Sequence, residues 1–162
     1  MRKKRISDSK LNVIRTSKKN SGKVYDLERR IFRANECFSQ SQLRYLFSSP
    51  NASFFLLRDN NSAVGFGITL KNKLRNGKYK GRIYSIGVLP ACRSIGGGRL
   101  LLDAMEKYLT RSNASFIVLE TLKGKGGAGI FFARHGYMES KFLPNYYPYG
   151  DAVRMRKTVA TG

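Results

Sequence analysis

The sequence contains no tryptophan, one histidine (His135) and two cysteines (Cys37 and Cys92). One histidine and two thiols are too few for a typical four-ligand structural zinc site, so we expect no metal centre. Two cysteines do not make the disulfide framework of a small secreted protein, which favours a reducing, cytoplasmic location. Because no apolar run approaches the roughly 20 residues that cross a bilayer, we expect no membrane partner.

Acidic residues are also scarce, with 10 Asp and Glu against 31 Lys and Arg, which gives a formal charge of +21. Such a charge predicts an anionic partner or cofactor but does not indicate a fold. The chain has 162 residues, is 41% hydrophobic and contains 10 Phe and 9 Tyr, so it can bury a real core. We expect a basic, flexible arm over residues 1–10 and a single domain over residues 11–162.

The hydrophobic periodicity predicts an alternation of strands and helices. Ser21 and Ser39 are candidate N-caps of two helices, a third helix follows Gly98, and a short one covers residues 130–134. Apolar runs predict strands at residues 11–15, 52–57, 63–70, 83–89, 115–121, 137–143 and 152–158. The order is β-α-α-β-β-β-α-β-α-β-β, which indicates one α/β or α+β domain without internal repeats.

The most informative segment begins at residue 83, where an apolar strand ends at Pro90 and a glycine-rich turn then leads into an amphipathic helix. The free N–H groups of the first helical turn and the helix dipole favour an anion there. Glycines let the backbone approach such a ligand closely, and Arg93 and Arg99 add positive charge. The segment predicts a pyrophosphate site, and a plain strand-to-helix turn is the alternative.

A second glycine-rich segment, residues 124–129, contains the spacing G-x-G-x-x-G. Too few residues follow it for a doubly wound dinucleotide-binding sheet. It is not a Walker A motif either, because Gly126 stands where Ser or Thr is needed. We therefore interpret this segment as a flexible loop.

Three segments together resemble a known superfamily. Ile86-Gly87-Val88-Leu89-Pro90, followed by Arg93-x-x-Gly96-x-Gly98, resembles the acetyl-CoA motif of the GNAT N-acetyltransferases. Phe131-Phe132-Ala133-Arg134-His135-Gly136-Tyr137 is similar to a later helix of that family. The segment from Asn145 to Met155, NYYPYGDAVRM, resembles the tail of the ribosomal-protein N-terminal alanine acetyltransferases.

The resemblance implies a mixed, mostly antiparallel, twisted sheet of six to seven strands flanked by about four helices. It also implies acetyl-CoA as cosubstrate, with the pantetheine arm pairing beside Ile86, Gly87 and Val88 where two strands part. The Val88 N–H would stabilise the oxyanion. Lys123, Lys125 and Arg134 are candidates for the 3′-phosphate. The turn that would hold the pyrophosphate comprises Arg93, Ser94, Ile95, Gly96, Gly97, Gly98 and Arg99.

The resemblance also implies catalytic roles. Glu120 matches the acidic position of the alanine acetyltransferases and is the candidate general base, with an ion-paired structural carboxylate as the alternative. Phe132 stands where that subfamily has a tyrosine acid, so Phe132 is interpreted as a core aromatic beside the cofactor. Tyr146 and Tyr147, in an expected loop before the last strand, are candidates to supply the proton instead. Tyr137 and water are the alternatives.

The sequence leaves three functions open. The first is an acetyl-CoA-dependent transfer of an acetyl group to a primary amine, preferably a protein or peptide N-terminus. The second is a basic module that binds nucleic acid or the ribosome, suggested by residues 71–82, which hold six Lys or Arg and no acid. The third, a small-molecule amine acetyltransferase, fits less well because a cationic amine would be repelled by the net charge.

Overall fold

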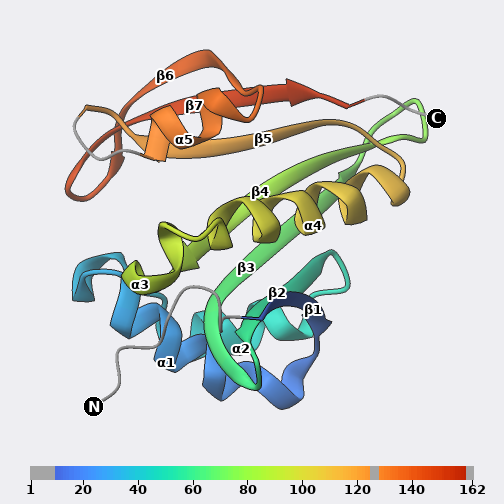
Figure 1. Ribbon diagram of the computed structural model, residues 1–162. Helices are drawn as coiled ribbons and strands as arrows, with labels where there is room; N and C mark the ends of the chain where they lie inside the picture. Colours follow the sequence, from blue (N-terminus) through green and yellow to red (C-terminus); the bar gives the residue numbers. More distant parts are fainter. Residues whose placement is uncertain (1–9, 125–127, 160–162) are drawn as a thin grey trace. The chain divides into compact units, whose positions relative to one another are not determined.

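The structure is a computed structural model, and it describes residues 10–124 and 128–159. Within these residues the chain forms seven β-strands, five α-helices and two short 3-10 helices. The elements follow each other as β1 (Leu11–Thr16), η2 (Lys18–Asn20), α1 (Ser21–Ile31), η3 (Ala34–Glu36), α2 (Gln40–Ser48), β2 (Ala52–Asp59), β3 (Ser62–Lys73), β4 (Tyr79–Val88), α3 (Pro90–Arg93), α4 (Gly97–Arg111), β5 (Ala114–Leu122), α5 (Ala128–Arg134), β6 (Met138–Tyr147) and β7 (Gly150–Thr158) (Figure 1).

The seven strands hydrogen-bond in the order β1-β2-β3-β4-β5-β7-β6. β4 and β5 are parallel, whereas β1 with β2, β2 with β3, β5 with β7 and β6 with β7 are antiparallel. The prediction of a mixed, mostly antiparallel sheet is therefore confirmed. Contacts divide the chain into two compact units: the residues up to Leu70 together with Ser85–Tyr108, and Lys71–Tyr84 together with the residues from Leu109 onward.

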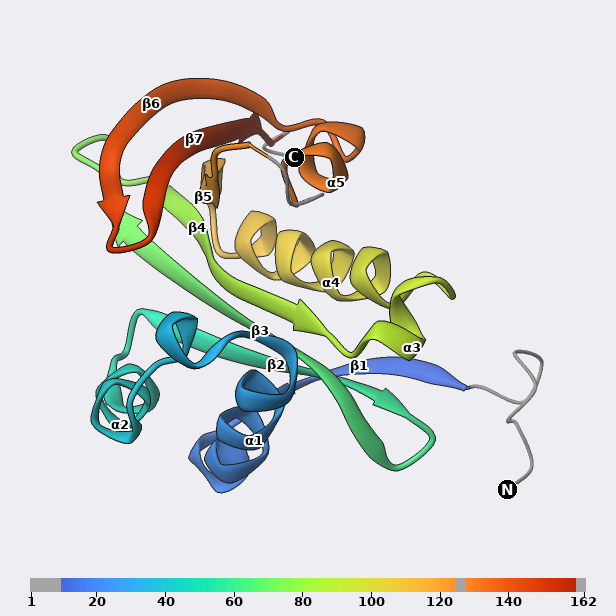
Figure 2. The same cartoon turned by 90° about the vertical axis from the view of Figure 1, so that its left-hand side faces the viewer.

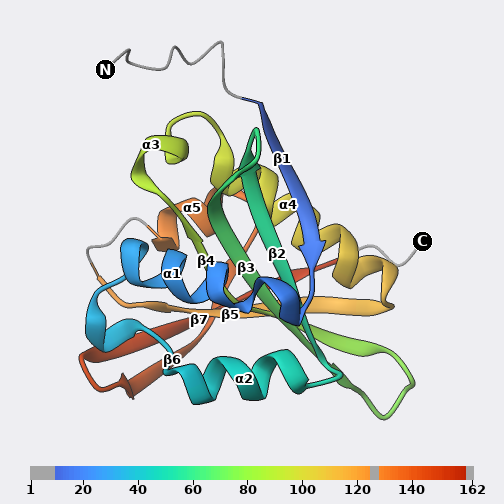
Figure 3. The same ribbon diagram turned by 90° about the horizontal axis from the view of Figure 1, so that it is seen from below.

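In the first unit, the strands β1, β2 and β3 lie side by side (Figure 3), with α1 and α2 on one face and α4 on the other (Figure 2). The alternation of β2 explains this arrangement, because neighbouring side chains of a strand point to opposite faces. Phe54 and Leu56 belong to the core cluster with Leu27 and Leu43 of the two helices. Phe55 points the other way, and its ring packs edge-on against Tyr108 of α4 at 5.6 Å.

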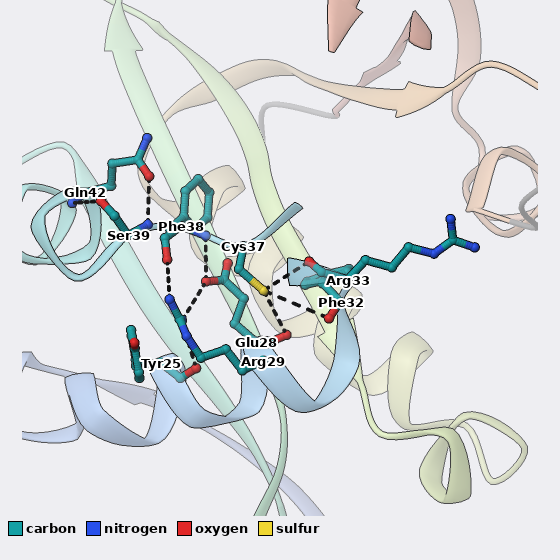
Figure 4. A network of polar contacts seen from close by, with 9 residues as sticks. All are labelled: Tyr25, Glu28, Arg29, Phe32, Arg33, Cys37, Phe38, Ser39 and Gln42. Carbon is teal, nitrogen blue, oxygen red and sulfur yellow. Dashed lines mark hydrogen bonds and ion pairs between the residues drawn. The ribbon is translucent and has the colours of Figure 1, made fainter. Parts of the chain in front are cut away.

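The connection between α1 and α2 is built around a buried carboxylate (Figure 4). Glu28 is 1% exposed, and its Oε1 accepts the Phe38 N–H at 2.8 Å. The Cys37 thiol donates to the Glu28 carbonyl at 3.6 Å, and burial raises the pKa of this thiol. Ser39 then caps α2, as the sequence predicts, because its Oγ accepts the Gln42 N–H and the Gln42 side chain accepts the Ser39 N–H in return.

In the second unit, β5, β7 and β6 form a sheet beside the first half of β4, and α5 packs on β5. α5 is held by aromatic contacts, since the buried Phe132 ring packs edge-on against Tyr137 at 5.7 Å. The basic residues 71–82 form the end of β3, the start of β4 and the turn between them. The turn contains Gly77 in the left-handed region, at φ +83°, which explains the Asn76-Gly77 pair.

Several elements differ from the sequence-based expectation. α1 begins at Ser21 with Asn20 as its N-cap residue, so Ser21 is not the cap. α5 begins at Ala128, inside the segment that was expected to be a loop. Pro90 does not simply end the strand but begins the four-residue helix α3, where its fixed φ suits the first helical position. β6 runs on to Tyr147, so Tyr146 and Tyr147 lie in a strand and not in a loop. A bulge with Asn145 at φ +53° precedes this end of β6, and the Asn145 N–H donates to Asp151 at 2.7 Å.

Among the residues that the structure describes, no helix combines the length and the apolar character needed to cross a membrane.

Candidate active site

The turn between β4 and α4 is anchored to the end of β4. The Arg93 Nε donates to the Val88 carbonyl at 2.9 Å, and the Cys92 N–H donates to the Leu89 carbonyl at 2.9 Å. Arg93 is therefore committed to a structural hydrogen bond with its Nε. Its side chain lies in an exposed position, so the rest of the guanidinium can still contribute positive charge.

Two of the three glycines in this turn have separate reasons to be glycine. Gly96 has φ +84° and no atom within 4 Å of a Cβ position, so it supplies a left-handed turn beside open space. Gly97 is buried, and a Cβ there would lie 2.6 Å from the Cys92 carbonyl oxygen. The turn thus packs tightly on its inner side and leaves backbone exposed at Gly96.

The N-terminus of α4 leaves free backbone donors beside this turn. α4 begins at Gly97, and its hydrogen bonding starts with the Leu100 N–H, which donates to the Gly96 carbonyl at 3.1 Å. The N–H groups before Leu100 have no intrahelical acceptor. The first turn carries no acidic side chain, so the helix dipole there is not neutralised locally. This end of the helix can bind an anion.

The end of β4 is closely packed in the first unit. A Cβ at Gly87 would lie 3.1 Å from both Ile31 and the Phe32 ring, and a Cβ at Gly65 would lie 2.9 Å from the Gly87 carbonyl oxygen. Val88 is 5% exposed and the Leu89 N–H donates to the Val64 carbonyl. The structure thereby brings the predicted positions Ile86, Gly87, Val88, Ser94, Ile95, Gly98 and Arg99 into one strand, turn and helix start.

In the second unit, Glu120 lies between two arginines. Its Oε1 accepts from the Arg82 Nη2 at 2.8 Å and from the Arg154 Nε at 2.9 Å. The Glu120 side chain is 7% exposed, against 21% for Arg82 and 30% for Arg154. Both partners follow from register, because Glu120 pairs with Arg154 in β7 and Arg82 pairs with Val118 in β5. The sequence did not identify either arginine as a partner of Glu120. The only signal was that basic residues stand two positions apart in β4 and again in β7.

Tyrosines of the β6–β7 hairpin lie beside Glu120. The Tyr147 hydroxyl donates to the Glu120 carbonyl at 3.3 Å, and its ring stacks on Tyr149 at 5.0 Å and packs edge-on against Tyr146 at 4.9 Å. Burial, and next the neighbouring Tyr149, raise the pKa of the Tyr147 phenol well above its usual value. Tyr146 and Tyr149 remain 44% and 38% exposed, so their surfaces are available for contacts.

Tyr84 on β4 joins the same group of aromatics, and sequence reasoning did not single it out. Burial is the main cause that raises the pKa of its phenol, followed by the neighbouring Tyr146. Its side chain is nevertheless 39% exposed. Glu120, Tyr84, Tyr146 and Tyr147 therefore form one cluster in the second unit, which we call the tyrosine cluster.

The remaining predicted site residues are Phe132 and Lys125. Phe132 is 6% exposed and packs between Phe131 and Tyr137, which agrees with a core aromatic. Lys125 falls in the short stretch outside the residues that the structure describes. No group of three or more His, Cys, Asp or Glu able to hold a metal ion occurs in residues 10–124 and 128–159.

Comparison with known proteins identifies related sequences and folds. The model of the "Acetyltransferase (GNAT) family" matches residues 22–137. An uncharacterized N-acetyltransferase from Methanocaldococcus jannaschii is 40% identical over 79 residues, which are 48% of this chain. That alignment covers 51% of the relative, so the chain spans about half the length of the curated relative that it matches.

Two solved structures share the fold over nearly the whole chain. The ribosomal-protein-S18-alanine N-acetyltransferase from Escherichia coli superposes with a TM-score of 0.80 at 18% identity, covering 94% of this chain and 96% of its own. Arabidopsis thaliana Naa50, in complex with the bisubstrate analogue CoA-Ac-MVNAL, gives a TM-score of 0.78 at 20% identity, covering 92% and 99%. At these identities the likeness shows the fold alone.

Proposed function

Because the chain belongs to the acetyltransferase (GNAT) family, we propose that it transfers an acetyl group from acetyl-CoA to a primary amine, and that this amine is the N-terminus of a protein or peptide. The observation that carries the activity is the family match over residues 22–137, which includes the turn into α4 and the strand that holds Glu120. The acceptor class is supported by the tyrosine cluster and by the net charge of +21.

The turn between β4 and α4 is the proposed site for the pyrophosphate of acetyl-CoA. The free N–H groups at the start of α4 suit an anion, and the open space at Gly96 lets a phosphate approach the backbone. Arg99 adds a positive charge in the first turn, although its Nε also lies 4.0 Å from Asp103. The backbone of Ile86, Gly87 and Val88 would pair with the pantetheine arm, and Lys125 and Phe132 stay candidate cofactor contacts.

The reaction forms a bond between the acceptor nitrogen and the acetyl carbon and breaks the carbon–sulfur bond of the thioester. The attacking amine must be neutral, which favours an α-amine, with a pKa of about 8, over a lysine, with a pKa of about 10.4. We propose that Glu120 accepts the amine proton, directly or through a water. The two arginines on Oε1 fix the orientation of this carboxylate.

The departing thiolate needs a proton, and Tyr146 and Tyr147 are the proposed sources. The raised pKa keeps the Tyr147 phenol protonated at neutral pH but also makes it a weaker acid. Water can serve as well, because a thiol with a pKa of about 8.5 is a good leaving group. We therefore expect loss of either hydroxyl to slow the reaction less than loss of the Glu120 carboxylate.

A second candidate function is the binding of a polyanion such as ribosomal RNA. The observation in its favour is the β3–β4 hairpin, where residues 71–82 carry six basic and no acidic side chains. This function is compatible with acetyl transfer, since a basic surface can bring an enzyme to its substrates. Both functions fit the cytoplasmic location proposed from the two cysteines.

Mass spectrometry of synthetic peptides incubated with acetyl-CoA tests the proposed function. We expect one acetyl group per peptide, located on the α-amine by fragmentation. Peptides whose α-amine is blocked but whose lysine is free should remain unmodified. Acetylation of lysine side chains or of a small amine such as spermidine, with no reaction at free N-termini, would contradict the proposed acceptor.

A further inference from the structure

One face of the sheet in the second unit carries a regular array of cations. Paired residues of neighbouring strands place their side chains on the same face, and residues two apart along a strand share it. In the register, Lys80 pairs with Phe116, Arg82 and Arg156 both pair with Val118, and Arg154 pairs with Glu120. This face, which we call the basic face, comprises Lys80, Arg82, Phe116, Val118, Glu120, Arg154 and Arg156.

Side-chain contacts agree with this assignment. Arg82 and Arg154 reach the same carboxylate oxygen of Glu120 from the two neighbouring strands. The Arg156 guanidinium lies 3.8 Å above the centre of the Phe116 ring, and Arg156 is exposed. Val118 on this face is 5% exposed, and Lys80 beside it is partly exposed.

The helical elements of this unit lie on the opposite face. A Cβ at Gly81 would touch Leu109 at the end of α4 at 3.0 Å, and Lys157 lies above the Tyr137 ring, next to α5. Both Gly81 and Lys157 alternate with the residues of the basic face. Within the described part of the second unit, neither α5 nor the end of α4 from Leu109 onward therefore covers the basic face.

Charge on the basic face is unbalanced. Its four cations face a single carboxylate, that of Glu120, which Arg82 and Arg154 already share. The other acidic residues among the described residues of this unit are Glu139 and Asp151, and their positions along the strands alternate with those of the basic face. Glu139 pairs with Met155, and Asp151 accepts the Asn145 N–H at 2.7 Å. Lys80 and Arg156 thus extend a positive surface that begins at the candidate base.

We propose that the basic face binds acidic side chains of the acceptor just downstream of its N-terminus, so that the enzyme prefers N-termini followed by Asp or Glu. This inference rests on the proposed function, because it takes Glu120 as the position of the amine. Glu120 and Phe116 are four residues apart in β5, which is about 13 Å. An extended peptide with its amine at Glu120 reaches Lys80 and Arg156 with its third to fifth residues.

The test compares peptides with identical first two residues and with Glu, Ala or Lys at positions three to five. We expect kcat/KM to be roughly 10-fold higher for the Glu peptide than for the Lys peptide at low salt. The difference should shrink as ionic strength rises, because the contacts are exposed. Binding of the same peptides, labelled with fluorescein and measured by anisotropy, provides a readout that does not depend on turnover.

A charge-reversed variant assigns the preference to the basic face. Lys80→Glu combined with Arg156→Glu should remove the preference for the Glu peptide or reverse it, while acetyl-CoA affinity stays the same. The control variant, Lys73→Glu with Arg75→Glu, makes the same change in net charge in and beside the turn of the β3–β4 hairpin, where both side chains are exposed. The control should keep at least most of the preference.

The outcomes separate this inference from the proposed function. Equal binding and turnover of Glu and Lys peptides by the wild type would overturn the inference and leave the acetyltransferase assignment intact. Selective binding of Glu peptides without turnover would support the basic face and contradict the proposed function. If a single-stranded RNA binds through Lys80 and Arg156 while the peptides show no charge preference, the face is a nucleic-acid site and the inference is wrong.

Discussion

The buried carboxylate of Glu28 stabilises the connection between α1 and α2. Oε1 accepts the Phe38 N–H, and Oε2 is buried without a hydrogen-bond partner among the described residues. The Arg29 Nη1 lies 3.7 Å from Oε1, and the thiol of Cys37 binds the backbone of the same turn. Desolvation outweighs the hydrogen bond and the arginine, and it raises the pKa of Glu28 to about 7.

This raised pKa predicts a pH-dependent stability. Between about pH 4.5 and 7 the folded protein keeps a proton on Glu28 that the unfolded chain releases, so the free energy of unfolding falls as the pH rises through this range. Glu28→Gln keeps an acceptor for Phe38 and cannot ionise. At pH 8 we expect the variant to be more stable than the wild type by roughly 1–3 kcal/mol.

Urea denaturation of both proteins at pH 4, 6 and 8 measures this effect, since other titrating groups are common to both. The two free energies of unfolding should diverge as the pH rises. A constant difference between the proteins across this range would contradict the account of Glu28.

Glu120 carries the second prediction at the scale of residues. Glu120→Gln retains an oxygen for Arg82 and Arg154 but cannot accept a proton from the amine. We expect kcat to fall roughly 10²- to 10⁴-fold while acetyl-CoA affinity is unchanged. Glu139→Gln, on the opposite face of the sheet, is the matched control and should keep its activity. Unchanged kcat in Glu120→Gln would remove the general-base role.

Sequence patterns could locate Glu120 and the hairpin tyrosines but not their partners. Arg82 lies 38 residues before Glu120 and Arg154 lies 34 after it, so these pairs depend on strand register. Register is fixed by the whole sheet and cannot be derived from local periodicity. Tyr84 could not be identified from the sequence either, because nothing in its local sequence distinguishes it from an exposed strand residue.

At the scale of elements, the turn into α4 combines two different uses of glycine. Gly97 is needed for packing on its inner side, while Gly96 is needed for its left-handed backbone. Sequence could identify this element because a strand, a glycine-rich turn and an amphipathic helix follow each other locally. It could not reveal α3, because a proline after a strand is compatible with either a stop or a first helical residue.

The packing role of Gly97 predicts a loss of stability on substitution. In Gly97→Ala the new Cβ would meet the Cys92 carbonyl oxygen and the side chains of Leu57 and Val88, so the turn must shift. We expect the free energy of unfolding to fall by about 1–3 kcal/mol. Gly22→Ala in α1 is the matched control, because no atom lies within 4 Å of its Cβ and alanine favours a helix. Equal unfolding midpoints for both variants in urea would contradict the tight packing of the turn.

At the scale of the whole molecule, the fold could be predicted because three motifs follow each other in a recognisable order along the chain. Three local motifs in the right order were enough to predict the mixed sheet, which has seven strands among the described residues. The charge of +21 predicted an anionic partner but could not say which surface carries it. The basic face emerges only when β4, β5 and β7 are aligned.

The central claim is that the turn from Arg93 to Arg99 binds the pyrophosphate of acetyl-CoA. Calorimetric titration of acetyl-CoA into the wild type and into Gly96→Glu tests it most directly, because the variant puts a negative charge into the open space beside the free N–H groups. Circular dichroism of both proteins verifies that the variant is folded. We predict binding by the wild type and an affinity at least about 100-fold lower in the variant. Equal affinities, or no binding by the folded wild type, would contradict the claim.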